Sequence, residues 1–324
     1  MSHVRRVVWF ERSVPEEFAD EVARQMDIAG PGTASDPFAG IESGMGVMAS
    51  AFRYDASVMD RAAHTLAIVR TGIGYDRVDI AAATDRGIAV CNTPDAPTVS
   101  TAEHAVALLL AATKGVVASF ERLRAGEGDL YSQHEAIELD GKTLGLVGFG
   151  RIARRVAAVA QSLGMNVVAF DPLLAAGTLA VPQVEDLDDL LRQADVVSVH
   201  VPLTSETNGL FDRRRFEVMK PGSFFINTSR GGVVDQDSLV EALDSGHLRG
   251  AGLDVTDPEP LPPNHPLLHR PNVLVTPHVA SATLEGRRRI FLAALAQMVA
   301  VLDGEQPEHL INPEVWTRRR RAGT

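Results

Sequence analysis

Three ionisable side chains stand where apolar runs of the sequence end. Arg230 follows FFINTS, Glu259 lies shortly after GLDV within GLDVTDPEP, and His278 follows NVLVTP. Arginine orients a carbonyl or carboxylate through a forked hydrogen bond, and histidine exchanges protons with alcohol or ketone oxygens near neutral pH. A glutamate beside the imidazole would hold its tautomer and favour its charged form. Each residue alone has an ordinary structural explanation, but together they predict the clamp and proton source that carbonyl reduction requires.

A glycine-rich turn in TLGLVGFGRIARRVA follows a predicted strand and opens a predicted helix. Gly148 and Gly150, with Ala153 in the third place, match G-x-G-x-x-G/A, which lets the backbone approach a pyrophosphate at a helix N-terminus. Asp171 follows about 20 residues later, where a carboxylate binds the ribose hydroxyls of NAD and repels the 2′-phosphate of NADP. The sequence therefore predicts NAD as the cofactor. The weaker alternative is a glycine turn followed by a helix-capping aspartate.

A second glycine turn, in VRTGIGYDRVD, has two interpretations. Gly72 and Gly74 flank Ile73, a spacing that would expose consecutive backbone N–H groups to a carboxylate. A simple turn leading into a helix capped by Asp76 explains the same residues equally well.

The elements that must position these residues alternate regularly. From Thr143 onward, the predicted strands are TLGLVG, NVVAF, DVVSVHVPL, SFFINTS, GAGLDV and NVLVTPH. Between them lie the predicted helices RIARRVAAVAQSL, EDLDDLLRQA, DRRRFEVMK and DQDSLVEALDSGHL, the last capped by Asp235 or Asp237. Earlier in the chain, RRVVWF, GVMAS, LAIVRTG and GIAVCNT are predicted strands, PEEFADEVARQM a helix, and the apolar stretch from about Thr101 one long packed helix. This alternation predicts an α/β fold with parallel, doubly wound sheets, which bind ligands at the carboxyl ends of their strands.

Composition narrows the class of protein. The 324 residues are enough for two domains, and a net charge of −11 disfavours nucleic acid or an anionic membrane as a general partner. The single cysteine, Cys91, excludes an intrachain disulfide and suits a reducing compartment. The start of the chain lacks the apolar core of a signal peptide, so a cytoplasmic protein is expected. No metal site is predicted, and the arginine run at residues 318–321 is expected to be a solvated tail.

The ordered motifs GFGRIARRVA, HVPLT, NTSRGGVVD, LDVTDPEP and TPHVASAT closely resemble the D-isomer-specific 2-hydroxyacid dehydrogenases, a family that includes glyoxylate/hydroxypyruvate reductases and phosphoglycerate dehydrogenases. The resemblance implies that Arg230, Glu259 and His278 are the catalytic residues. It also implies that the substrate-binding residues are Thr71, Gly72, Ile73, Gly74, Arg230 and His278. The implied cofactor-binding residues are Gly148, Gly150, Arg151, Ile152, Asp171, His200, Pro202, Thr207, Thr228, Asp254 and Thr101.

The same resemblance implies two Rossmann-like or flavodoxin-like α/β domains with parallel sheets. A substrate domain (residues 1–98 and 285–324) would contain an inserted NAD-binding Rossmann domain (residues 99–284), with catalysis in the cleft. Family members are commonly homodimers built on the cofactor domain, with TAEHAVALLLA and the arm after it contributing, so a homodimer is expected here.

The substrate is expected to be a small unphosphorylated 2-oxo acid, of the glyoxylate or hydroxypyruvate type. Phosphoglycerate-oxidising relatives often present an arginine where Ala49 stands, and many carry a further C-terminal regulatory domain, whereas this sequence ends at Thr324. Arg53 lies close enough in sequence to keep a D-3-phosphoglycerate dehydrogenase as an alternative. An alternative of another class is a non-enzymatic NAD(H)-sensing protein that uses the same fold to recruit a partner.

Overall fold

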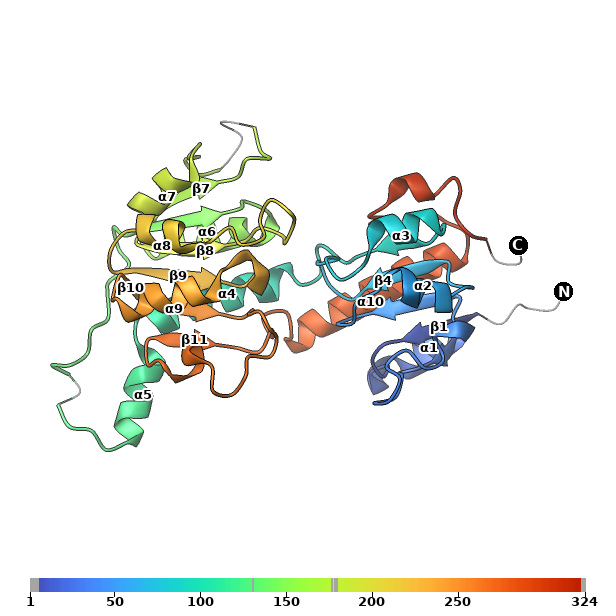
Figure 1. Cartoon of the computed structure of the whole chain (residues 1–324), viewed down its shortest axis with the longest axis horizontal. Helices are drawn as coiled ribbons and strands as arrows, with labels where there is room; N and C mark the ends of the chain where they lie inside the picture. The colour runs from blue at the N-terminus through green and yellow to red at the C-terminus, as the bar shows by residue number, and fades with distance from the viewer. Residues whose placement is uncertain (1–5, 130, 176, 178–179, 322–324) are drawn as a thin grey trace. The chain divides into compact units, whose positions relative to one another are not determined.

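The computed structural model describes residues 6–129, 131–175, 177 and 180–321, which form two compact units. Unit 1 comprises Met1–Pro97 and Leu284–Thr324, and unit 2 comprises Thr98–Thr283. Each unit is built on its own parallel sheet covered by helices (Figure 1). The predicted α/β class with parallel sheets is confirmed. No helix among the described residues is long and apolar enough to cross a membrane.

Unit 2 contains a six-stranded parallel sheet in the order β11-β10-β9-β8-β6-β7. Its strands are β6 (Thr143–Val147), β7 (Asn166–Phe170), β8 (Val196–Val199), β9 (Ser223–Asn227), β10 (Leu248–Leu253) and β11 (Val273–Val275). Strand order reverses at β6, because β7 lies on one side of it and β8 on the other. The carboxyl ends of β6 and β8 therefore flank the switch point at which such sheets bind ligands.

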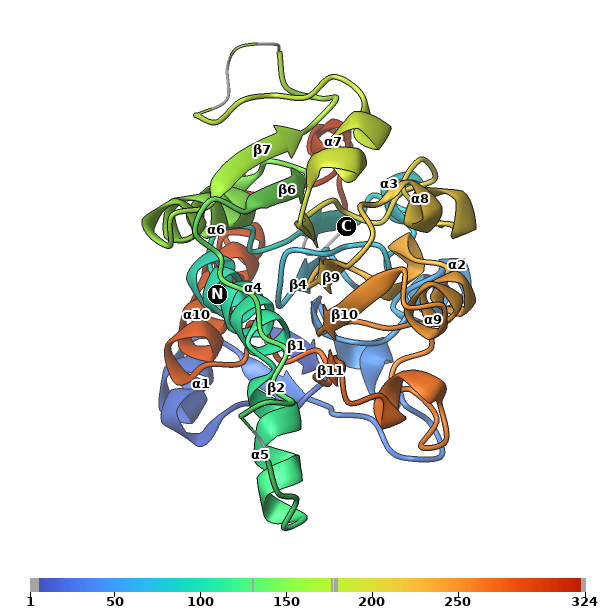
Figure 2. The ribbon, with the colours of Figure 1, turned by 90° about the vertical axis from the view of Figure 1, so that its left-hand side faces the viewer.

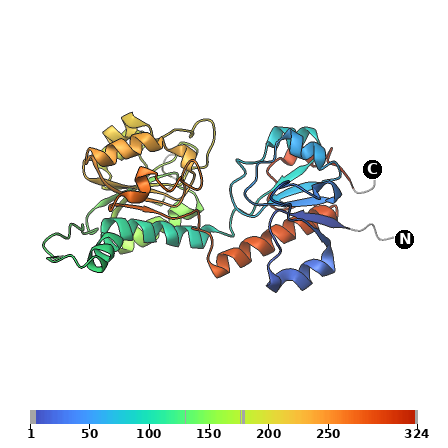
Figure 3. The same ribbon diagram turned by 60° about the horizontal axis from the view of Figure 1, so that its bottom comes forward.

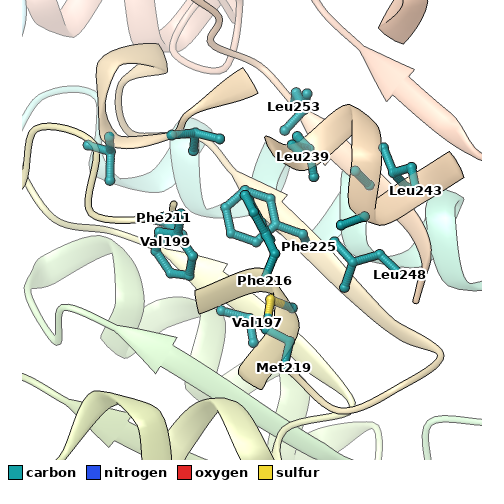
Figure 4. Packing of buried hydrophobic residues seen from close by; sticks show 14 of the residues in the cluster. Val197, Val199, Phe211, Phe216, Met219, Phe225, Leu239, Leu243, Leu248 and Leu253 are labelled. Atoms are coloured by element: carbon teal, nitrogen blue, oxygen red, sulfur yellow. The ribbon is translucent and has the colours of Figure 1, made fainter. Parts of the chain in front are cut away.

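Apolar side chains on both faces of this sheet are covered by helices. One core cluster joins the sheet to α4 (Thr98–Thr113) and α6 (Arg151–Ser162). The other joins it to α7 (Leu187–Gln193), α8 (Arg213–Val218) and α9 (Gln236–Asp244). In this second cluster the rings of Phe211 and Phe216 meet Phe225 of β9 edge-on, with centroids 4.9 and 5.3 Å apart (Figure 4). The short 3₁₀ helices of unit 2 are η3 (Gly231–Val233) and η4 (Pro266–His269).

Unit 1 contains a five-stranded parallel sheet in the order β2-β1-β3-β4-β5. Its strands are β1 (Val7–Phe10), β2 (Asp27–Ala29), β3 (Gly46–Ala49), β4 (Ala67–Arg70) and β5 (Ala89–Cys91). One face packs on α1 (Ala19–Gln25) and α10 (Leu284–Leu302), and the other on α2 (Ala56–Arg61) and α3 (Ile80–Asp85). Figure 3 shows α10, in orange-red, on one face and α2 and α3, in blue to cyan, on the opposite face. The 3₁₀ helices of unit 1 are η1 (Glu16–Phe18), η2 (Ile41–Ser43) and η5 (Pro313–Val315).

Aspartates fix where several helices begin. Asp235, one of the two predicted caps, accepts hydrogen bonds from the first turn of α9 and is its N-cap. The alternative in which Asp76 caps a helix is wrong, because α3 begins at Ile80 and Asp79 caps it. The preceding residues pair instead with the loop after β3, through a bridge between Val78 and Tyr54.

The long helix predicted from about Thr101 differs from the structure in two ways. It begins at Thr98, and it ends at Thr113, because Gly115 adopts a left-handed φ of 57° and starts α5 (Val116–Arg124) in a new direction. Apolar composition continues across this break, so periodicity alone did not reveal it.

The prediction that residues 318–321 form a solvated tail is wrong for Arg319 and Arg320, whereas Arg318 and Arg321 are exposed. Arg319 stacks on the Trp316 ring at 3.6 Å, and Arg320 donates hydrogen bonds to the carbonyls of Ala62 and Thr65 at 3.2 Å. The Arg320 amide also bonds to the Gly87 carbonyl at 2.9 Å. Burial lowers the pKa of Arg320 below its usual range, which is consistent with a docked side chain.

Candidate active site

The predicted histidine and glutamate lie together at the carboxyl edge of the unit 2 sheet. The Nδ1 atom of His278, after β11, lies 3.1 Å from the Oε2 atom of Glu259, which follows β10. The His278 side chain is 45 % exposed and that of Glu259 is 24 % exposed. Burial alone would raise the pKa of Glu259, but the hydrogen bond and charge of His278, together with the Thr256 amide and the Arg230 charge, hold it below its usual value. Glu259 is thus a stabilised carboxylate beside a half-exposed imidazole ring.

A tight loop presents Glu259 to the imidazole. Its Oε1 atom accepts from the Thr256 amide at 3.2 Å, and the Thr256 hydroxyl donates to the Pro258 carbonyl at 2.9 Å. The Asp257 amide is bonded to the Gln236 side chain at 3.0 Å, which ties the loop to α9. The Thr256 amide therefore holds the carboxylate directly, and α9 holds the loop that carries it.

Asp254 organises the loop that carries His278. Its carboxylate accepts from the Thr276 hydroxyl at 2.6 Å and from the Val279 and Ala280 amides at 2.9 and 2.8 Å. Its backbone carbonyl accepts from the His278 amide at 2.8 Å, and His278 itself adopts a left-handed φ of 53°. Asp254 therefore holds the loop on both sides of the histidine.

Sequence reasoning missed a further member of this network, His104 of α4. Its Nε2 atom lies 2.9 Å from the Thr276 hydroxyl and 3.4 Å from the Asp254 carboxylate. Burial alone would raise the pKa of Asp254, but the bonds from His104, Thr276 and the two amides hold it below its usual value. The sequence spacing could have identified His104, because it lies one helical turn from Thr101, a predicted cofactor-binding residue, and shares its face of the helix.

Arg230 follows β9 in extended backbone geometry, with φ −146° and ψ 143°. Its Nη1 atom donates to the Ser229 carbonyl at 2.7 Å, and its own carbonyl accepts from the Asn227 side chain at 2.9 Å. Its guanidinium charge is among the causes that lower the pKa of Glu259. The three predicted catalytic residues therefore stand at the ends of consecutive strands β9, β10 and β11 of one sheet.

The glycine fingerprint adopts a conformation that leaves a helix N-terminus open. Gly148 has φ 88°, and a Cβ there would lie 2.9 Å from the His200 carbonyl oxygen, so only glycine fits. Gly150 is the N-cap of α6, with no side-chain cap and no heavy atom within 4 Å of a Cβ placed on it. The first-turn N–H groups of α6, which begins with Arg151 and Ile152, can therefore bind phosphate oxygens.

Asp171, after β7, is held against this turn. Its carboxylate accepts from the Phe149 amide at 2.9 Å and from the Leu173 amide at 3.0 Å. These two bonds fix the carboxylate beside the fingerprint, as binding of the ribose hydroxyls would require.

The other predicted cofactor residues lie in the loops after β8 and β9 and in α4 of the same unit. His200 follows β8; burial lowers its pKa to about 4, so the ring is neutral, and its Nε2 atom lies 2.9 Å from the Ser198 hydroxyl. The Thr207 hydroxyl closes the loop after β8 by donating to the Pro202 carbonyl at 2.6 Å. The Thr228 hydroxyl oxygen, after β9, is buried without a partner among the described residues, as expected of a group that meets a ligand. Thr101 is buried in α4. These residues fit a dinucleotide.

In unit 1, Thr71, Gly72, Ile73 and Gly74 follow β4, and the carbonyl groups of the last three are turned toward protein donors. The carbonyls of Gly72, Ile73 and Gly74 accept from the Thr93 amide at 3.0 Å, Asn92 Nδ2 at 2.7 Å and Arg70 Nε at 3.0 Å. Within the part of the chain that the structure describes, no protein group accepts from the backbone N–H groups of residues 72–74. Of the two interpretations of this turn, the geometry favours the one with N–H groups available to an anion.

Comparisons with known proteins agree with this arrangement. Residues 106–280 match the family model for the NAD binding domain of D-isomer specific 2-hydroxyacid dehydrogenases. Glyoxylate reductase of Thermofilum pendens is 43 % identical over 269 residues, which cover 81 % of this chain and 79 % of that protein. D-3-phosphoglycerate dehydrogenase of Archaeoglobus fulgidus is 40 % identical over 269 residues, 82 % of this chain but 51 % of that enzyme, so the chain spans about half the length of that relative.

Solved structures extend the likeness to nearly the whole chain. The TT0316 protein of Thermus thermophilus shares 40 % identity and a TM-score of 0.86, covering 94 % of this chain and 99 % of that one. D-lactate dehydrogenase of Aquifex aeolicus, solved with NAD and lactic acid, shares 27 % identity and a TM-score of 0.85, covering 94 % and 99 %. The resemblance noted in the motifs is confirmed, and so is NAD as the cofactor. The chain belongs to the D-isomer specific 2-hydroxyacid dehydrogenase family, NAD-dependent oxidoreductases that act on CH–OH donors.

Proposed function

We propose that the protein interconverts a small, unphosphorylated 2-oxo acid, of the glyoxylate or hydroxypyruvate type, and the corresponding D-2-hydroxy acid. The observation that carries this proposal is the 3.1 Å contact between His278 and Glu259, at the carboxyl edge of the sheet that bears the fingerprint. When bound, NAD(H) supplies or accepts the hydride.

His278 is the acid/base. Because Nδ1 faces Glu259, the second ring nitrogen, Nε2, is left to exchange a proton with the substrate oxygen. Glu259 holds that tautomer and stabilises the imidazolium form that donates the proton during reduction. Arg230 orients the carbonyl and carboxylate oxygens, and residues 72–74 bind the substrate carboxylate through their N–H groups. Thr71 supports this turn, because its own amide donates to the Ala49 carbonyl.

The end of β3 and the loop after it favour the proposal of a small substrate. Ala49, where phosphoglycerate-oxidising relatives often have arginine, is completely buried at the end of β3, and its carbonyl accepts from Thr71. Arg53 is exposed beyond this loop, and its charge acts on Asp55 at the start of α2. The identity to the glyoxylate reductase of Thermofilum pendens points the same way.

Turnover of NADH against a panel of 2-oxo acids tests this function. We expect the largest kcat/KM with glyoxylate or hydroxypyruvate and a much smaller value with 3-phosphohydroxypyruvate. A larger kcat/KM with 3-phosphohydroxypyruvate would establish the phosphoglycerate dehydrogenase alternative, which the Archaeoglobus fulgidus relative favours. NADH binding without turnover of any member would instead establish the NAD(H)-sensing alternative.

We also propose that the protein is a homodimer in the cytoplasm, where the single buried thiol of Cys91 suits the reducing conditions. Helix α5 has no buried residue, and Figure 2 shows it extending away from α4 and the six-stranded sheet. Its apolar side chains Val116, Phe120 and Leu123 are 56, 56 and 64 % exposed, which is unusual for a monomer surface. Light scattering should give twice the chain mass, and Phe120→Asp combined with Leu123→Asp should give the monomer mass.

A further inference from the structure

A buried carboxylate closes the carboxyl end of the five-stranded sheet where its strand order reverses. Glu11 follows β1, residues 50–52 follow β3, and these two strands are neighbours. In the order β2-β1-β3-β4-β5, the reversal between β1 and β3 creates the crevice in which open α/β sheets bind ligands. Glu11 is only 6 % exposed, so the crevice holds a charge that belongs to the chain itself.

The Glu11 carboxylate is satisfied by the loop after β3. It accepts from the amides of Ser50 at 2.7 Å and Phe52 at 3.1 Å, from the Ala51 amide between them, and from the Tyr54 hydroxyl at 2.8 Å. Three successive N–H groups directed at one anion form a backbone nest. Burial and the adjacent Glu11 carboxylate raise the pKa of Tyr54, so its hydroxyl remains a donor.

Arg70 connects this nest to the glycine turn of residues 71–74. Its guanidinium donates through Nη1 to the Ser50 carbonyl and through Nε, at 3.0 Å, to the Gly74 carbonyl. Thr71 adds two bonds to the Ala49 carbonyl, from its amide at 2.9 Å and its hydroxyl at 3.1 Å. The loops after β3 and β4 are therefore one hydrogen-bonded body that is anchored on Glu11.

We propose that Glu11 is a positioning residue for substrate binding: it fixes residues 50–52, and through Arg70, which holds the Gly74 carbonyl, it fixes the turn that carries the N–H groups of residues 72–74. The inference rests on the proposed function, since it takes those N–H groups as the site of the substrate carboxylate. A neutral side chain at position 11 is a weaker acceptor for these four donors, so both loops loosen together.

Steady-state kinetics of Glu11→Gln gives the first test. We expect KM for the 2-oxo acid to rise about tenfold, kcat to change by less than about twofold, and the dissociation constant of NADH to stay the same. Tyr54→Phe removes one bond to the same carboxylate and should raise KM by about threefold. Asp55→Asn is the matched control, because Asp55 caps α2 in the same segment without bonding to either loop. Its KM should equal that of the wild type.

Hydrogen exchange measured by mass spectrometry gives the second test, and it requires no activity. In Glu11→Gln, peptides containing residues 50–52 and residues 72–74 should both exchange faster, while peptides from unit 2 should not change. If Glu11→Gln does not fold, Tyr54→Phe is judged by the same two measurements. Faster exchange at residues 50–52 alone, or an unchanged KM in a variant with loosened loops, would overturn the proposal. A wild-type protein that turns over no 2-oxo acid would instead refute the proposed function. In that case, the hydrogen-exchange experiment would still show whether Glu11→Gln loosens residues 50–52 and residues 72–74 together.

Discussion

The Nδ1 atom of His278 and the Oε2 atom of Glu259 lie 3.1 Å apart, although 19 residues separate them in the sequence. Their strands, β11 and β10, are parallel neighbours, so both loops leave the sheet at the same edge. The pairing leaves the other ring nitrogen available for proton transfer.

Glu259→Gln should lower kcat by about 10²-fold, because an amide cannot stabilise the imidazolium form of His278. Asp257→Asn, in the same exposed loop, is the control and should keep wild-type kcat. A wild-type kcat in Glu259→Gln would contradict the role given to this carboxylate.

Arg230→Ala should lower kcat/KM for the 2-oxo acid by about 10³-fold while leaving NADH affinity nearly unchanged. Arg230→Lys should recover only part of the loss, since a lysine ammonium cannot form the forked pair of hydrogen bonds. Stopped-flow measurement of NADH binding separates the two effects. Wild-type turnover in Arg230→Ala would remove this residue from the mechanism.

Asp171→Ser should weaken NADH binding by about tenfold and narrow the preference for NADH over NADPH. The carboxylate that binds ribose hydroxyls also repels a 2′-phosphate, so its removal has opposite effects on the two cofactors. Fluorescence titration with each cofactor measures both changes. An unchanged ratio of the NADH and NADPH dissociation constants would mean that Asp171 serves only as the hydrogen-bond acceptor of the Phe149 amide.

Asp254→Asn should destabilise the protein by about 2 kcal/mol at neutral pH, because the buried carboxylate satisfies two amides and a hydroxyl. The pKa of Asp254 in the folded protein lies below its ordinary value of 3.8, so the unfolded chain binds this proton more tightly. The stability that Asp254 adds is therefore complete above that ordinary value and is lost as pH falls through the lower, folded pKa. Urea unfolding measures the free energy of unfolding of the wild type and of Asp254→Asn. The difference between the two free energies should become smaller as the pH falls below 3.8. A constant difference would contradict this linkage.

The sequence predicted most strands and the catalytic candidates because parallel strands have near-continuous apolar runs and a common direction. Arg230, Glu259 and His278 could be placed at one edge on that basis alone. The break at Gly115 was not predicted, because apolar helix-forming residues continue on both sides of a glycine whose left-handed φ ends α4.

Glu11 shows why other parts of the site were missed. In the sequence it is an ordinary charged residue after a short apolar run, and its hydrogen-bond partners lie 39 to 43 residues away. The same is true of Arg320, whose acceptors Ala62 and Thr65 are more than 250 residues distant. Contacts of this range depend on how loops from different strands meet, and no local pattern encodes that.

The most direct test of the central claim is the rate of NADH oxidation with glyoxylate and hydroxypyruvate, compared between the wild type and His278→Gln at equal cofactor saturation. The proton-transfer role predicts turnover by the wild type and a loss of about 10³-fold or more in kcat for the variant, with NADH affinity preserved. Turnover by His278→Gln at the wild-type rate would contradict it.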